Sequence, residues 1–207
     1  METAEHQYLA PGFTRSLSWL AILGAIGLVV GNIVGSIVVP NHDFVADTVS
    51  DLAAGRYEII QDVSLYGFAI ALVALGLASA HLHNGAPQWS FLTFCLVVLA
   101  LCVVIIGARN EYGDGDSDGV VIHIYVVYAL GILFAAVFAL MGMQGGRVAE
   151  FLVPLSFVCL AIWAIAAPIF FILPTEWDGI WERGLGVVTV AWTIGYGLAL
   201  RRFALRN

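Results

Sequence analysis

LSWLAILGAIGLVVGNIVGSIVV, residues 17–39, contains no charged side chain and decides the class of fold. A transmembrane helix needs about 20 consecutive apolar residues to cross roughly 30 Å of hydrocarbon, and this stretch is long enough. A cleaved signal peptide would combine a basic start with a shorter apolar stretch, whereas residues 1–16 are mixed in character. The stretch therefore predicts a first transmembrane helix that is not cleaved.

Five further apolar runs follow along the chain. Of the whole sequence 61% is hydrophobic and only 11% is charged, against about 25% charged residues in an ordinary soluble domain. We therefore predict an all-α polytopic membrane protein, a bundle of six transmembrane helices over residues 17–200, between a tail at 1–16 and a basic tail at 201–207. The predicted spans are Leu17–Val39, Val63–Ala80, Phe91–Ala108, Val120–Met141, Phe151–Leu173 and Gly184–Leu200.

The distribution of charge predicts the orientation in the cell membrane. All 8 basic residues are Arg, so the chain has no lysine for a retinal Schiff base. An even number of crossings puts both tails on one side, where more Arg residues fall, so the positive-inside rule makes both tails cytoplasmic. Most carboxylates then lie outside, and this acidic surface argues against nucleic acid as a partner. The cytoplasmic Arg residues are Arg15, Arg147, Arg201, Arg202 and Arg206, and the outer ones are Arg56, Arg109 and Arg183.

Glycines recur in the first span at a spacing of four residues. Gly27, Gly31 and Gly35 would share one face of a helix, with Gly24 close to them. Small residues at this spacing let a second backbone approach closely. We expect another helix of the same chain to pack along this strip.

The segment from Asp43 to Asp62 has the pattern of an amphipathic helix, with apolar residues on one face and carboxylates on the other. It predicts a short helix that lies in the outer interface after the first span and is broken at Gly55. Asp51, beside Ser50, is the carboxylate of most interest. One interpretation is that the acidic face gathers cations, and the other is that it is simply solvated.

Residues 114–119, DGDSDG, match the first half of a calcium-binding loop. Asp114, Asp116 and Asp118 stand at positions one, three and five, with a glycine at position six. Position twelve needs a bidentate Glu but falls on a tyrosine of the next span, so Glu111 would have to supply the missing carboxylate. A calcium site is one interpretation, and an acidic linker without a metal is the other.

Ionisable residues at the outer helix ends form a second candidate site. His123 lies near the outer end of the fourth span, where an ionisable residue is a functional candidate by default. The alternative is a structural histidine that is hydrogen-bonded between helices. Three histidines do not meet on this side, which argues against a zinc hydrolase. We expect a polar cluster in which Arg109 and Arg183 pair with Asp51, Glu111 or Glu182.

Three short stretches occur in the order of a known family. They are TVSDL at 48–52, an acidic turn followed by His123, and WERG at 181–184 with Trp192 further along the same helix. On these stretches the sequence resembles the prokaryotic membrane family known as domain of unknown function 998. The resemblance implies a six-helix bundle with both ends cytoplasmic and no established reaction. The Asp-Gly segment is richer in acid than the family pattern, so the resemblance gives its aspartates no role.

These observations leave three functions open. The favoured one is an accessory, sensing or binding protein in the lipid bilayer, whose acidic outer face holds a cation, a lipid head group or a partner. The second is a metal-dependent intramembrane lipid hydrolase. The third is a subunit of a larger bioenergetic membrane complex, with other membrane subunits as partners and a histidine that holds a haem or pigment. The candidate catalytic residues are Ser50, Asp51, His123 and Glu182.

Overall fold

Six long helices dominate the computed structural model, which describes residues 10–53, 55–108 and 122–206. All six are long and apolar enough to cross a membrane, which confirms the predicted polytopic all-α bundle. A seventh, much shorter helix follows the first. The α-helices are α1 (Pro11–Val38), α2 (Val49–Leu52), α3 (Glu58–His81), α4 (Pro87–Ala108), α5 (Ile122–Gln144), α6 (Leu152–Phe170) and α7 (Asp178–Arg206).

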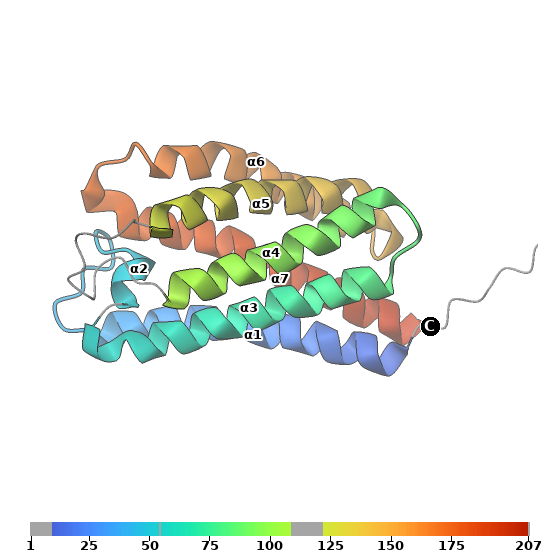
Figure 1. The fold of residues 1–207 in the computed structure, drawn as a ribbon, viewed down its shortest axis with the longest axis horizontal. Helices are drawn as coiled ribbons and strands as arrows, with labels where there is room; N and C mark the ends of the chain where they lie inside the picture. The colour runs from blue at the N-terminus through green and yellow to red at the C-terminus, as the bar shows by residue number, and fades with distance from the viewer. Residues whose placement is uncertain (1–9, 54, 109–121, 207) are drawn as a thin grey trace, which may run out of the picture.

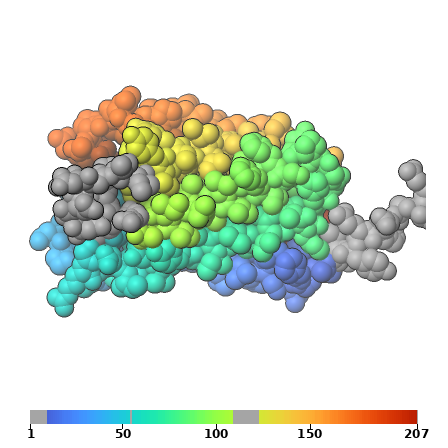
Figure 2. Space-filling model, in the orientation of Figure 1, coloured from blue at the N-terminus to red at the C-terminus, as the bar shows by residue number. Residues whose placement is uncertain are grey.

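The long helices lie side by side in chain order and close into a ring. α3 packs between α1 and α4, α5 between α4 and α6, and α7 returns to α1. Figure 2 shows the face on which α3, α4 and α5 are neighbours. In Figure 1, α2 lies at one end of the bundle and the C-terminus at the other. The end that carries α2 is called the α2 end below; α5 and α7 begin there.

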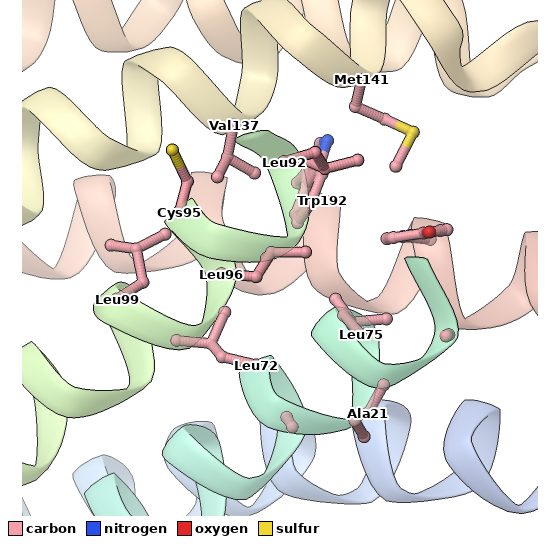
Figure 3. Close-up of a cluster of buried hydrophobic side chains, with 14 of the residues drawn as sticks. Ala21, Leu72, Leu75, Leu92, Cys95, Leu96, Leu99, Val137, Met141 and Trp192 are labelled. Carbon is pink, nitrogen blue, oxygen red and sulfur yellow. The ribbon is translucent and has the colours of Figure 1, made fainter. Parts of the chain in front are cut away.

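The centre of the ring is filled by apolar side chains around Trp192 of α7. Figure 3 shows Leu75 of α3, Leu96 of α4 and Val137 of α5 directed toward this region. Trp192 is fully buried, and its indole N–H donates to Ser156 Oγ at 3.0 Å. A buried indole thus keeps a hydrogen-bond partner inside an apolar core.

The glycine strip of α1 is a packing surface within the chain, as predicted. A Cβ on Gly24 would collide with the backbone carbonyl of Gly67, and one on Gly31 would collide with Ser64, both in α3. At Gly35 it would lie 3.4 Å from Leu52 of α2. Gly27 alone among the four has no atom within 4 Å of its would-be Cβ. The two helices therefore approach as closely as small residues allow.

The amphipathic segment after α1 forms less helix than its pattern predicts. α2 has 4 residues, and Gly55, with a φ of 77°, separates it from the start of α3. A left-handed φ suits glycine and ends the helix where the sequence predicts a break. Leu52 is 1% exposed and lies under Gly35, so α2 is held against the bundle. The last carboxylates of the pattern, Glu58 and Asp62, belong to α3.

The outer circumference of the bundle is apolar. Ile132, Ile165 and Val187, from three different helices, are 72%, 66% and 64% exposed. Such a surface cannot face water over a whole bundle, because exposed apolar area of this extent drives association. The protein is a multi-pass membrane protein whose circumference contacts the lipid bilayer.

Candidate functional site

A cavity of about 330 Å³ opens among the helices toward the α2 end. Along α5 its wall runs from His123 to Phe134, which corresponds to about 16 Å at roughly 1.5 Å per residue. Its volume lies in the range of roughly 300–1,000 Å³ typical of small-molecule sites. Most of the wall is apolar, with side chains that include Leu28, Leu65, Val127, Phe134, Trp163 and Val190. Thr189, whose hydroxyl donates to the Gly186 carbonyl, lies further along α7, and the other polar side chains gather at the α2 end: Asn32, Ser50, His123, Glu182 and Arg183.

Ser50 and His123 meet at the polar end of this cavity. Ser50 Oγ lies 3.2 Å from His123 Nε2, within hydrogen-bond distance. His123 is only 9% exposed. Its Nδ1 is buried and has no hydrogen-bond partner among the described residues. One ring nitrogen of His123 is therefore hydrogen-bonded to the Ser50 hydroxyl, and the other has no hydrogen-bond partner among the described residues.

The position of Ser50 is fixed by the cap at the start of α2. Thr48 Oγ1 accepts from the Asp51 backbone N–H at 3.2 Å, and Asp51 Oδ2 accepts in return from the Thr48 backbone N–H at 2.6 Å. This reciprocal capping box starts a helix even in so short a segment. The Asp51 carboxylate also accepts from the Thr48 hydroxyl at 2.8 Å. Asp51 thus shapes the segment that carries Ser50.

Glu182 connects α7 to the same segment. Its Oε2 accepts from the Val49 backbone N–H at 2.7 Å, one residue before Ser50. The first N–H groups of a helix have no partner within the helix, so a carboxylate from another helix satisfies one of them here. Glu182 therefore positions Ser50 and also lines the cavity.

Arg183 uses all of its N–H groups to tie three segments together. The residue is 8% exposed, and its guanidinium stacks on the Phe44 ring with 4.2 Å to the centroid. A guanidinium has five N–H donors and no acceptor, so no N–H remains for a ligand. The acceptors are Asn32 Oδ1 at 3.1 Å, Phe44 O at 3.0 Å, Asp47 O at 2.8 Å, Ser36 Oγ at 3.4 Å and His42 Nε2 at 2.8 Å.

The partners of Arg183 must accept hydrogen bonds from it. This requirement fixes the amide orientation of Asn32 and the tautomer of His42. Asn32 presents Oδ1 to Arg183, so its Nδ2 is the atom that is left buried without a partner among the described residues. His42 presents an unprotonated Nε2, so its proton sits on Nδ1, 3.4 Å from Asp47 Oδ2. Burial and the adjacent Arg183 charge lower the pKa of His42 below its usual value of 6.5.

The loop before α2 is folded on its own carboxylates. Asp43 Oδ1 accepts from the backbone N–H groups of Val45 at 2.8 Å and Ala46 at 3.3 Å, and these bonds lower the pKa of Asp43. The carbonyls of Val45 and Ala46 accept in turn from the first backbone N–H groups of α7, at Ile180 and Gly179. Asp43, one of the carboxylates for which cation binding and simple solvation were the two interpretations, is therefore used to fold the loop that binds α7.

The structure describes five of the ten predicted site residues, Ser50, Asp51, His123, Glu182 and Arg183, and all five lie at the α2 end. Ser50 contacts His123, and Glu182 holds the backbone next to Ser50. Arg183, predicted to pair with a carboxylate, instead binds carbonyls and neutral side chains, because five acceptors already surround it; among the described residues it forms no ion pair with Asp51 or Glu182. The remaining predicted residues lie outside the described part of the chain and are Arg109, Glu111, Asp114, Asp116 and Asp118.

Two residues of the site escape the sequence analysis. Asn32 lies within an apolar span, and a polar residue in such a place is a functional signal that the glycine strip around it obscures. His42 is separated from Arg183 by 141 positions, and no local pattern indicates their contact. As for metals, the described residues contain no group of three His, Cys, Asp or Glu side chains placed to hold an ion.

Comparison with known proteins gives one finding. A family model described as "Protein of unknown function (DUF998)" matches residues 22–199, from the middle of α1 to about two turns before the end of α7. The matched region therefore includes the whole cavity and every residue of the polar end. No curated protein and no solved structure matches the chain.

Proposed function

The chain belongs to the DUF998 family of proteins of unknown function, and from that premise we propose that this integral membrane protein binds a lipid in its cavity. The acyl chain lies between the long helices, and the polar part of the lipid lies at the α2 end. The sequence favours a binding function and leaves a cation, a lipid head group or a partner as the ligand. The proposal made here selects a lipid.

The observation that carries the proposal is the pairing of an apolar cavity with unsatisfied polar atoms at one end. Asn32 Nδ2 and His123 Nδ1 are buried without a partner among the described residues, and both residues line the cavity. Buried polar atoms are almost always hydrogen-bonded, so an orphan atom needs an explanation. A ligand with a long apolar part and a polar end satisfies both halves of the site.

The chemistry of the orphan donor narrows the polar end of the ligand. Asn32 Nδ2 donates, so it fits an acceptor oxygen such as an ester or amide carbonyl. Arg183 has no N–H left to form the paired bonds that recognise a phosphate. A lipid whose carbonyl group lies at the α2 end therefore fits better than an anionic head group.

The arginine distribution supports an outer-leaflet site. With both tails cytoplasmic, the α2 end lies at the outer face of the cell membrane. A lipid would then enter from the outer leaflet with its polar part toward the outside.

Cross-linking with an ether lipid that carries a photoreactive group in its alkyl chain tests the proposal. In lipid nanodiscs we expect cross-links to residues of the cavity wall in the wild-type protein. Gly131→Leu and Gly186→Leu add side chains on the cavity wall, where no atom lies within 4 Å of the would-be Cβ. Each should reduce these cross-links about tenfold or more, because a leucine fills space that the alkyl chain needs.

Gly184→Leu is the matched control. It lies on α7 two residues before Gly186, its would-be Cβ also has no neighbour within 4 Å, and it does not line the cavity. Leucine favours the helix over glycine in all three variants by up to about 1 kcal/mol, so loss of helix is not the expected cause. The same extent of cross-linking in all four proteins would reject the cavity as a lipid site.

A further inference from the structure

The polar end of the cavity holds a hydroxyl and an imidazole in direct contact. Ser50 Oγ and His123 Nε2 lie 3.2 Å apart, at the upper limit of the distance that a nucleophile and its base need before a substrate binds. Both residues line the cavity. Resting on the lipid-binding function proposed above, we propose that Ser50 is the nucleophile and His123 the general base of a lipid esterase that cleaves an acyl ester of the bound lipid.

The hydrogen bond to Ser50 determines which tautomer of His123 can act as the general base. With the proton on Nδ1, His123 Nε2 accepts from the Ser50 hydroxyl and is ready to take its proton. Nδ1 then carries the orphan N–H, which needs an acceptor from the ligand or from water.

The nucleophile is held by groups that do not react. The capping box of Thr48 and Asp51 fixes the turn that carries Ser50, and Glu182 fixes the preceding backbone N–H. Such support matters because catalytic groups must be held within a fraction of an ångström of their productive geometry. In this proposal Asp51 and Glu182 are positioning residues.

Asn32 supplies the remaining element that ester cleavage needs. The negative charge that develops on the carbonyl oxygen requires a hydrogen-bond donor that is already in place. Asn32 Nδ2 is a buried donor on the wall of the same cavity, and Arg183 holds the amide in the orientation that leaves this donor free for a ligand. The ester carbonyl would thus lie between Ser50 and Asn32.

The reaction is a hydrolysis without a change of oxidation state. Ser50 Oγ forms a bond to the carbonyl carbon while its proton passes to His123 Nε2. The bond from that carbon to the alcohol oxygen breaks, and the Nε2 proton goes to the leaving alcohol. Water then attacks the acyl carbon and gives one proton to His123. The bond between that carbon and Ser50 Oγ breaks, Ser50 Oγ takes the proton from His123, and the carboxylic acid is released. One ester and one water give one acid and one alcohol.

The test uses the full-length protein in detergent micelles with two probes. A long-chain alkyl fluorophosphonate should add to Ser50, as located by peptide mass spectrometry, and a fluorogenic long-chain acyl ester should be hydrolysed. Ser50→Ala should abolish both signals. His123→Gln should lower ester hydrolysis by about 10²–10⁴-fold, the contribution of a general base. Ser16→Ala, whose hydroxyl donates to the Gly12 carbonyl in the first turns of α1, is the control and should behave as wild type.

His123→Gln separates catalysis from structure. Glutamine still reaches a hydrogen bond with Ser50 but does not take up a proton, so a purely structural histidine would leave hydrolysis and labelling unchanged in this variant. Such a result would overturn the proposal, as would fluorophosphonate labelling that persists in Ser50→Ala.

Cross-linking of the ether lipid, which has no ester to cleave, is measured for every variant to show that the fold and cavity are intact. A wild-type protein that cross-links the ether lipid but neither reacts with the fluorophosphonate nor hydrolyses the ester would overturn the esterase and leave the lipid-binding function standing. A wild-type protein that does not cross-link the ether lipid would overturn both.

Discussion

Arg183 sets the chemical state of its neighbours because a guanidinium can only donate hydrogen bonds. Each atom that faces it must accept, so the amide of Asn32 and the imidazole of His42 each have a single orientation that fits. The residue therefore organises the polar end of the cavity without an N–H of its own left for a ligand. An Arg that connects α1, α7 and the loop before α2 is a structural centre of the site.

His42 gives the site a pH dependence whose sign follows from this contact. Its pKa is lowered mainly by burial and then by Arg183, while Asp47, Asp51 and Asp43 oppose the shift. A lowered pKa means that the unfolded chain takes up the proton more readily. The stabilising contribution of neutral His42 is therefore complete above about pH 6.5 and is lost as the pH falls through the lowered pKa.

The measurement is the thermal unfolding midpoint in detergent between about pH 8 and about pH 5. We expect the wild-type midpoint to fall more on acidification than that of His42→Gln, because the glutamine carbonyl can accept from Arg183 at every pH in this range. Parallel curves for the two proteins would show that His42 does not titrate in this way.

At the scale of single residues, the sequence predicts which side chains matter better than it predicts their contacts. His123 and Glu182 are identifiable because they are ionisable residues at the ends of apolar runs, and Ser50 because it stands beside Asp51 in the amphipathic segment. Their pairing is not, since Ser50 and His123 are 73 positions apart and meet only when α2 docks on the bundle. Arg183 illustrates the same limit, because a search for opposite charges overlooks backbone carbonyls as partners.

At the scale of elements, the joint between α7 and the preceding loop depends on Gly179. A Cβ at this position would collide with the Asp47 carbonyl and lie 2.8 Å from Arg183 Nη1. Gly179→Ala should displace the loop and destabilise the protein by about 1–3 kcal/mol, the usual cost of overpacking. Gly184→Ala, on the same helix with open space around its would-be Cβ, should be neutral or stabilise by up to about 1 kcal/mol.

Reversible unfolding in mixed micelles of detergent and sodium dodecyl sulfate measures both variants. Equal stability of Gly179→Ala and wild type would contradict the close approach of α7 to the loop. A similar loss in Gly184→Ala would instead assign the effect to α7 as a whole.

Hydropathy predicts the long elements and fails for the short one, for a physical reason. A span of about 20 apolar residues forms a helix in lipid regardless of its neighbours, because unpaired backbone groups are too costly there. α2 has only 4 residues, and its extent is set by the capping box at Thr48, the glycine at position 55 and contact of Leu52 with α1. The amphipathic pattern alone overstates its length because α3 takes over at Glu58.

For the whole molecule, the predicted orientation makes the α2 end extracellular. Cysteine introduced at Glu176, next to the start of α7, should react with a membrane-impermeant maleimide on intact cells. Cysteine introduced at Arg206, at the other end of α7, should react only after the membrane is opened. Both positions are exposed, and the native cysteines Cys95, Cys102 and Cys159 are buried, so they contribute little background. The opposite labelling pattern would invert the orientation.

The closed ring of helices also has a consequence for the order in which the protein is made. Synthesis proceeds from the N-terminus, so α1 can pair with α3 while later helices are still on the ribosome. Ser50 and His123 enter the membrane well before α7, which carries Glu182 and Arg183 and contacts both α6 and α1. A nascent chain that stops before Asp178 therefore contains the hydroxyl and the imidazole but lacks the helix that anchors them. Of the described helices, α7 leaves the ribosome last, and it is the one that completes the site.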